Sequence, residues 1–315
     1  CTTLYANFPK PLKTTAYTVS NTAYAPIAIN GTPVSFTDDK FTNALPLGFE
    51  FCFFNQVYTQ CYLSDNGVLT FNNMYSGGNC NNNIQQTLPY FNSTFPDNAI
   101  FFLFMDINPN QGESIQYATT GVAPYRKFIV SYQNVRLFGN TCAGTTSSFQ
   151  VVLSETTHTI ETFIGNKVVC DNNPNQYANF ATVGIQNIGA TTFYTAPGKH
   201  ASIFTTANEG IRFSPAGPLD YIMTWENKYG QTIAANTDSV LFCPDNFPYD
   251  CIRAKIEIFC PHSFQYDSVI INKPIPTINN IQIVQPLCDN NTTEAILVNA
   301  TVVAPPAQYA LNNGP

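Results

Sequence analysis

Charged side chains are scarce in this sequence. Only 10% of its 315 residues are Asp, Glu, Lys or Arg, whereas about 25% are charged in a typical soluble domain. The 13 basic residues are outnumbered by 20 acidic ones, which gives a formal net charge of −7. Because binding to a nucleic-acid backbone needs concentrated positive charge, we expect no nucleic-acid partner.

The motifs of metal and redox sites are also missing. The sequence has three widely spaced histidines, His158, His200 and His262, and its ten cysteines form no Cys-x-x-Cys pair. Zinc sites and dithiol redox sites depend on such spacings. The cysteines therefore favour disulfides, which persist in oxidising compartments, and we expect an extracellular protein.

A long hydrophobic run is absent as well. No stretch reaches the roughly 18 apolar residues of a membrane-spanning helix, and the apolar run of residues 99–107 has the length of a strand. No signal peptide is visible, so we expect that an exported chain loses its leader by cleavage before Cys1. Cys1 is compatible with lipidation after that cleavage, with a disulfide, or with no special role.

Catalytic signatures are likewise lacking. The sequence contains no Gly-x-Ser-x-Gly, His-Glu-x-x-His or phosphate-binding loop, and its acids are thinly scattered. We therefore expect no enzymatic activity and no cofactor, with calcium as the one possible exception.

Strand patterns fill the sequence in place of helices. Residues 126–138 place Phe128, Val130 and Tyr132 on one face and Ser131 and Gln133 on the other, which is the period-two alternation of a strand with one buried face. Residues 147–165 have the pattern of a hairpin that turns near residue 156. Many short strands separated by polar turns predict an all-β fold built of sandwiches.

Two proline-containing linkers, residues 214–218 and 272–277, divide the pattern. We expect an N-terminal β-sandwich over 1–217, an Ig-like β-sandwich over 218–275 and the start of a third β module over 276–315. Trp225 is placed like the core tryptophan of an Ig-like sandwich. The turn-forming end "NNGP" indicates that the native chain continues.

The cysteine spacings suggest three disulfides. Eight residues separate Cys52 and Cys61 on neighbouring strands, which suits a bridge across them. The other two predicted pairs flank strands: Cys142 with Cys170 around the long hairpin, and Cys243 with Cys260 in the second module. The partners of the remaining four stay open, and Cys288 has a possible partner beyond Pro315. A reactive pair is disfavoured because no cation flanks Cys52 or Cys61.

One oxygen-rich turn partly imitates a calcium loop. Its candidate ligands are Asp106, Asn108, Asn110 and Glu113. The glycine comes one place late and no acid stands at the twelfth position of an EF-hand, so a polar turn is the alternative. Asp38 and Asp39 form a second oxygen-rich spot, or a turn that leads into a strand.

Several segments, taken in order, resemble a known family. "LPLGFEFCFFNQVYTQCYLSDNGVLTF", "FPDNAIFFLFMDINPNQGESIQY", "RKFIVSYQNVRLF", "QVVLSETTHTIETFI" and "TVGIQNIGATTFYTAPG" resemble the N-terminal domain of large Bacteroidota surface proteins exported by type IX secretion. They are also similar to nidogen-like domains of animal matrix proteins. "WENKYGQTI … VLFCP … IFC" is similar to the Ig-like domains that follow, and "IVQPLCDNNTTEAILVNATV … YALNNGP" to an SprB-type repeat of gliding-motility adhesins.

The resemblance implies a cell-surface adhesin, associated with the outer membrane and active in adhesion or gliding motility. Its partners would be a surface polysaccharide or another cell-surface protein, together with the type IX secretion and gliding machinery. Two other roles stay open: a stalk or filament subunit that docks on a surface protein, and a non-catalytic carbohydrate-binding region of a secreted enzyme. Asp-Ser-Val triplets at Ser239 and Ser268 resemble the O-glycosylation signal of exported Bacteroidota proteins.

Overall fold

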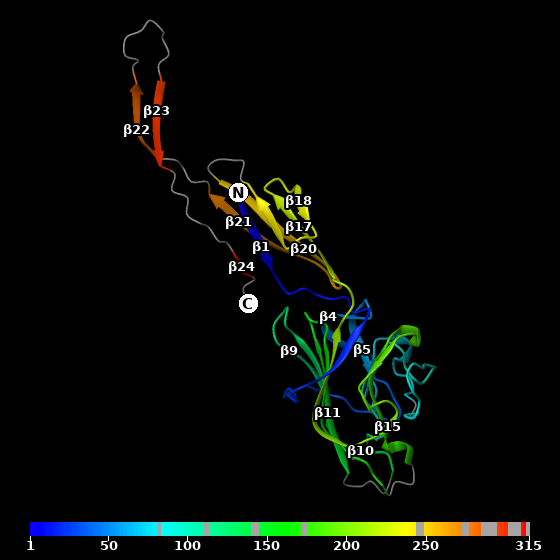
Figure 1. Ribbon diagram of the computed structural model, residues 1–315. Coiled ribbons are helices and arrows are strands. Elements are labelled where there is room, and N and C mark those ends of the chain that lie inside the picture. The colour runs from blue at the N-terminus through cyan, green and yellow to red at the C-terminus, as the bar shows by residue number, and fades with distance from the viewer. Residues whose placement is uncertain are drawn as a thin grey trace. The chain divides into compact units, whose positions relative to one another are not determined.

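The computed structural model shows an all-β protein (Figure 1). It describes residues 1–80, 83–109, 114–139, 145–171, 176–243, 249–272, 277–284, 295–301 and 310–312. Within these ranges the helical elements are three short 3₁₀ turns, η1 (Asn73–Tyr75), η3 (Gln176–Asn179) and η4 (Ile188–Ala190). The predicted fold class is confirmed. No helix of the described residues is long and apolar enough to cross a membrane.

The chain divides into two units, a larger one over Pro11–Asp220 and a smaller one made of Cys1–Lys10 and Tyr221–Pro315. The larger unit contains an eight-stranded sheet with the order β2-β16-β12-β11-β10-β9-β3, in which β8 also pairs with β10. Its strands are β2 (Tyr17–Thr22), β3 (Thr32–Pro33), β8 (Ile107–Asn108), β9 (Ser114–Thr120), β10 (Lys127–Leu137), β11 (Thr146–Ser154), β12 (Ile160–Lys167) and β16 (Thr206–Pro215).

A seven-stranded sheet packs on its inner face. The order is β14-β13-β7-β6-β5-β4, with β15 beside β13. Its strands are β4 (Leu45–Phe53), β5 (Gln56–Leu63), β6 (Val68–Thr70), β7 (Ala99–Phe104), β13 (Phe180–Gln186), β14 (Phe193–Thr195) and β15 (Ser202–Ile203). Phe102 of β7 joins the sheets, because its ring centroid lies 5.4 Å from that of Tyr132 and 5.6 Å from that of Phe149.

The alternation predicted for β10 is confirmed, because Phe128, Val130 and Tyr132 all lie in the core between the two sheets. Strand β7 is buried on both faces: Phe102 enters this core, whereas Phe101 and Phe104 enter a second cluster on the opposite face. A strand covered on both sides needs apolar residues at every position, which explains the unbroken run of residues 99–104.

The smaller unit is a small sandwich. One sheet has the order β18-β17-β20-β21 and the other β19-β1-β24. The strands are β1 (Thr2–Asn7), β17 (Tyr221–Asn227), β18 (Thr232–Ala235), β19 (Ser239–Phe242), β20 (Tyr249–Phe259), β21 (His262–Asn272) and β24 (Ala310–Asn312). Trp225 is fully buried between Leu4 and Phe242 of one sheet and Ile252 and Ala254 of the other, as its position in the sequence predicted.

The predicted domain limits need correction at the N-terminus. Residues 1–10 do not belong to the first sandwich, because β1 pairs with β19 and β24 of the smaller unit. The larger unit is therefore inserted between β1 and β17. Its two ends are adjacent, because the N–H of Asp220 donates to the carbonyl of Pro11 at 2.9 Å. Leu12 and Leu219 also form an isolated antiparallel β-bridge.

The segment predicted to start a third module contains a two-stranded sheet. It consists of β22 (Thr277–Val284) and β23 (Ala295–Thr301), paired antiparallel.

Candidate functional site

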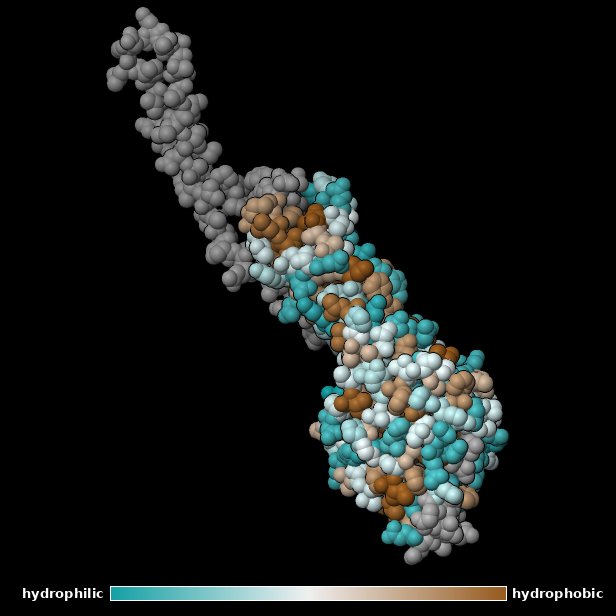
Figure 2. Space-filling view, turned by 45° about the vertical axis from the view of Figure 1, so that its right-hand side comes forward, coloured by the Kyte–Doolittle hydropathy of each residue, from teal (hydrophilic) through white to brown (hydrophobic). Residues whose placement is uncertain are grey.

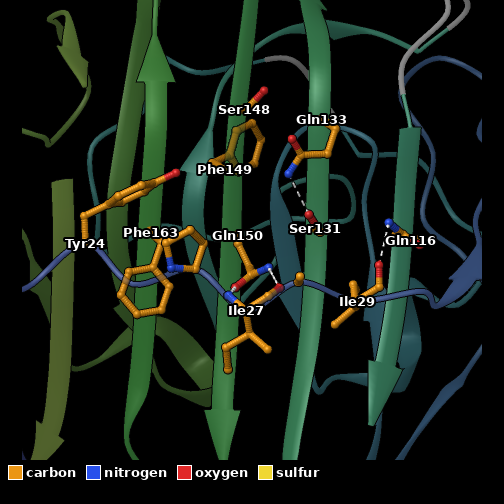
Figure 3. Close-up of a pocket in the computed structure, with 12 residues that line it drawn as sticks. Tyr24, Ile27, Ile29, Gln116, Ser131, Gln133, Ser148, Phe149, Gln150 and Phe163 are labelled. Atoms are coloured by element: carbon orange, nitrogen blue, oxygen red, sulfur yellow. Dashed lines mark hydrogen bonds between the residues drawn. The ribbon is translucent and has the colours of Figure 1, made fainter. Parts of the chain in front are cut away.

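A strap of extended chain, residues 24–31, crosses the outer face of the eight-stranded sheet (Figure 3). Ile27 and Ile29 of this strap pack on Ile129, Val152 and Phe163. The strap therefore covers an apolar patch on a face that would otherwise meet water. Contacts with residues at least 85 positions away in the sequence hold it in place.

Two glutamine side chains of the sheet bind the backbone of the strap. Oε1 of Gln150 accepts from the N–H of Ile27 at 2.8 Å, and its Nε2 donates to the carbonyl of Ile27 at 2.8 Å. Gln116 similarly accepts from the N–H of Gly31 at 2.9 Å. These amides take the place of a neighbouring strand, so the N–H and carbonyl groups that they contact are paired.

Beside the strap lies a hollow of about 360 Å³. Strands β9, β10, β11 and β12 supply its floor, and the strap and Tyr24 supply walls (Figure 3). Its polar lining consists of the glutamines Gln116, Gln133 and Gln150 and the serines Ser131 and Ser148. None of the lining residues carries a charge, which fits the hollow for uncharged hydrogen-bonding ligands.

Gln133 and Ser148 provide an acceptor and a donor at this hollow. Nε2 of Gln133 donates to Oγ of Ser131 at 2.9 Å, and among the described residues Oε1 of Gln133 has no donor. Oγ of Ser148 accepts from the N–H of Asn134 at 3.0 Å, so its own hydroxyl proton remains available to a ligand. In Figure 3 the amide oxygen of Gln133 points toward the side of strand β11, which carries Ser148.

The sequence pattern predicted the face on which part of this site lies, but it did not predict a binding site there. Alternation put Ser131 and Gln133 on the polar face of β10, and the structure confirms that face. Tyr24 and the strap escaped notice because their position depends on Gln150, which is 123 residues away from Ile27. The only local signal is the alternating "PIAIN" of residues 26–30, next to a turn-forming glycine.

A second polar cluster consists of Asp38 and Asp39 of the predicted oxygen-rich turn together with Asp65. One carboxylate oxygen from each of Asp38, Asp39 and Asp65 lies within 4.8 Å of the others. Asp65 is fully buried and accepts from the N–H groups of Asp39, at 2.8 Å, and Lys40, at 3.2 Å. Burial raises the pKa of Asp65 to about 8 and also raises the pKa values of Asp38 and Asp39. These bonds clamp the turn before Phe41, which is the structural role the sequence suggested as an alternative.

The predicted calcium loop is only partly described. Asp106 is buried, and its carbonyl accepts from the N–H of Phe138 at 2.9 Å. Asn108 lies on β8 opposite Arg136. Asn110 and Glu113 lie outside the described residues, so calcium binding at this turn stays a prediction.

The predicted Cys52–Cys61 disulfide is wrong. Cys61 is a buried free thiol, although Cys52 is disulfide-bonded. In the β4–β5 hairpin Cys52 lies opposite Val57, whereas Cys61 lies opposite Leu45. Four strand positions, about 13 Å, separate the two cysteines along the hairpin, and a disulfide requires Cα atoms within about 7 Å.

Cys243 forms a disulfide with Cys1 and not with Cys260. The reason is the pairing of β1 with β19, which places Thr2 opposite Phe242 and brings the adjoining cysteines together. Cys170 and Cys260 are also disulfide-bonded. Cys142 lies outside the described residues, as does Cys288.

The two serines of the predicted glycosylation signals lie in different environments. Ser268 is exposed on β21, whereas Ser239 is half-buried at the start of β19. Attachment of a glycan needs an accessible hydroxyl, so the exposure of Ser268 is compatible with modification. Both sites stay predictions.

Disulfides and two β-sandwiches are typical of extracellular β-proteins. Comparison with known families gives the same result: the model of the family described as NIDO related matches residues 16–225, more than half of the chain. The chain therefore belongs to the NIDO-related family, as the resemblance to nidogen-like domains led us to expect. No curated protein and no solved structure matches it.

Proposed function

We propose that this chain is an extracellular adhesion segment whose larger unit binds an uncharged polysaccharide in the hollow beside the strap. The role is binding without catalysis. The observation that carries this proposal is the lining of the hollow, where three amide and two hydroxyl side chains meet Tyr24 and no charged group. Amide and hydroxyl groups match the hydroxyls of a neutral sugar, and an aromatic ring offers an apolar face.

The surface character of the larger unit favours this role over a stalk that docks on another protein. A stalk interface would need a broad apolar patch. On the face shown in Figure 2, the described residues of the larger unit form a mosaic in which the hydrophobic areas are small and separated. A solvated polar hollow is therefore the better-supported recognition element on this unit.

The cellular setting is proposed from the resemblance in the sequence. Similarity to Bacteroidota surface adhesins supports export by type IX secretion, outer-membrane association and a part in adhesion or gliding motility. Calcium at the Asp106 turn and a glycan on Ser268 belong to the same proposal.

Binding of the intact chain to immobilised polysaccharides tests the function. We expect retention on at least one neutral polysaccharide, with little change between low and high salt because no ion pair is formed. Tyr24→Ala should weaken binding about tenfold, equivalent to about 1.4 kcal/mol. Tyr125→Ala is the control, since Tyr125 is an exposed tyrosine of the same unit outside the hollow. Failure to bind any neutral polysaccharide would disprove the proposal.

A further inference from the structure

We propose that two copies of this chain associate through strand β21, which pairs antiparallel with its counterpart and joins their two four-stranded sheets into one. The inference concerns the smaller unit and is independent of the proposed function. Strand β21 stands at the end of the order β18-β17-β20-β21, and among the described strands β20 alone pairs with it (Figure 1). The other edge of β21 therefore offers backbone N–H and carbonyl groups to a further strand.

This edge lacks the features that protect other sheet edges. Natural sheets protect their edges with short strands, prolines, lysines or bulges. In the larger unit, edge strand β3 has two residues and contains Pro33, and edge strand β4 contains Pro46 and a register shift. Strand β21 has eleven residues, is the longest terminal strand of the described sheets, and contains no proline or lysine. Its pairing with β20 runs through all eleven residues without a shift.

The outward face of β21 carries an exposed apolar row. Phe264 is 43% exposed, Tyr266 54% and Ile270 60%. Ser268 belongs to the same row, because alternate residues share a face, whereas Val269 packs on the core of the unit. These four outward residues carry no charge. A second strand at the edge would set another row of side chains beside them, and such cross-strand contacts stabilise a sheet.

The two aromatic rings of this row are held by β20 before a partner arrives. The guanidinium carbon of Arg253 lies 5.0 Å from the ring centroid of Tyr266, and Nζ of Lys255 lies 4.7 Å from that of Phe264. The two rings also stack on each other, with centroids 6.3 Å apart. Side chains that are already ordered lose less conformational entropy on association.

A second copy is the partner that best matches this edge. A two-fold axis between antiparallel strands places one residue opposite itself. With the axis at Asp267, like charges would face each other and destabilise the pairing. With the axis at Tyr266, residues 262–270 of both copies pair, the two Tyr266 rings are neighbours, and Asp267 lies opposite Gln265 of the second copy, whose amide can donate to the carboxylate.

The charge of the strand also argues against a different polypeptide as the partner. Apart from His262, Asp267 is the only ionisable side chain among residues 262–265 and 267–272, and Tyr266 is neutral at pH 7. An edge with so little charge has no pattern that would select an acidic or a basic strand. It matches a strand that carries the same apolar row, and the chain itself supplies one.

Sedimentation equilibrium of the intact chain tests the inference. We expect the mass to rise with concentration from 34.8 kDa toward twice that value. Tyr266→Lys would place two like charges opposite each other at the axis and should weaken association about tenfold. Tyr229→Lys is the matched control, because Tyr229 is 71% exposed in the turn between β17 and β18, and it should associate like the native chain. The fluorescence of Trp225 checks that the smaller unit of each variant is folded.

Tyr266→Cys tests the register. Residues directly opposite each other in antiparallel strands are close enough for a disulfide, so mild oxidation should link two copies of Tyr266→Cys and leave Tyr229→Cys unlinked. A single-chain mass at every concentration would overturn the inference and leave the edge to another polypeptide. A dimer that Tyr266→Lys does not weaken, or that Tyr266→Cys fails to link, would place the contact elsewhere and overturn it as well.

Discussion

Asp65 and Lys167 are ionisable side chains buried in the larger unit without an ion pair among the described residues. Asp65 is held by two backbone N–H groups, and Nζ of Lys167 donates to the carbonyl of Asn179 at 2.7 Å. Burial raises the pKa of Asp65 to about 8 and lowers the pKa of Lys167 to about 8. In both cases removal from water penalises the charged form, so the pH dependence of stability reports on these two residues.

For Asp65 the sign follows from a folded-state pKa above the ordinary value of 3.8. Between about pH 4 and 8 the folded state binds this proton more readily than the unfolded state, so the unfolding free energy falls as the pH rises. We expect Asp65 to contribute a fall of about 4 kcal/mol between pH 5 and 8. Urea titrations that follow the larger unit should show this fall in the native chain and a much flatter profile in Asp65→Asn.

Gly165 controls the wall of the hollow. A Cβ atom at this position would lie 2.8 Å from the hydroxyl of Tyr24, closer than side chains tolerate. Gly165→Ala should displace the Tyr24 ring, weaken polysaccharide binding about tenfold and change the unfolding free energy by less than about 1 kcal/mol. Parallel binding and urea measurements check this, and the idea fails if Gly165→Ala binds like the native chain.

At the scale of elements, the strap is the part whose position depends most on side chains. It is secured by Gln150, Gln116 and the packing of Ile27 and Ile29. Strands β10 to β12, in contrast, are held by ladders of backbone hydrogen bonds. Removal of one glutamine should therefore loosen the strap and leave the sheet intact.

Gln150→Leu tests this dependence. The change leaves the N–H and carbonyl of Ile27 without their partner, which should cost about 1–3 kcal/mol. Hydrogen exchange should show lost protection at the Ile27 amide and retained protection at Gly31, which Gln116 still holds. Unchanged exchange at Ile27 would show that the strap does not rely on Gln150.

The elements also show which features a sequence can predict. Side chains alternate between the two faces of a strand, so the buried face of β10 was predicted correctly. Alternation does not fix which residue lies opposite which, and this is why Cys52 and Cys61 were paired wrongly. The positions of the strap and of Asp65 depend on contacts between segments that are distant in the sequence. The periodicity of side chains within one segment does not predict such contacts.

At the scale of the whole molecule, the Cys1–Cys243 disulfide joins residues 242 positions apart. It links the start of β1 to the end of β19, two paired strands of the smaller unit. The bond therefore stabilises the smaller unit by keeping β1 near its partner when that unit unfolds. The larger unit needs no such support from it.

Cys1→Ser should lower the unfolding free energy of the smaller unit by about 2–4 kcal/mol. Trp225 is the single tryptophan of the chain and lies in this unit, so its fluorescence follows the smaller unit alone. The fluorescence midpoint in urea should fall, while the midpoint from tyrosine absorbance, dominated by the larger unit, should stay. A shift of both midpoints would contradict this independence.

The neighbouring positions of Pro11 and Asp220 have a mechanical consequence. Tension applied between β1 and the C-terminal strands would run through the Cys1–Cys243 bond and would leave the insertion of Pro11–Asp220 outside the path of the load. The insertion would then keep its fold, and with it the hollow, while the smaller unit carried the load.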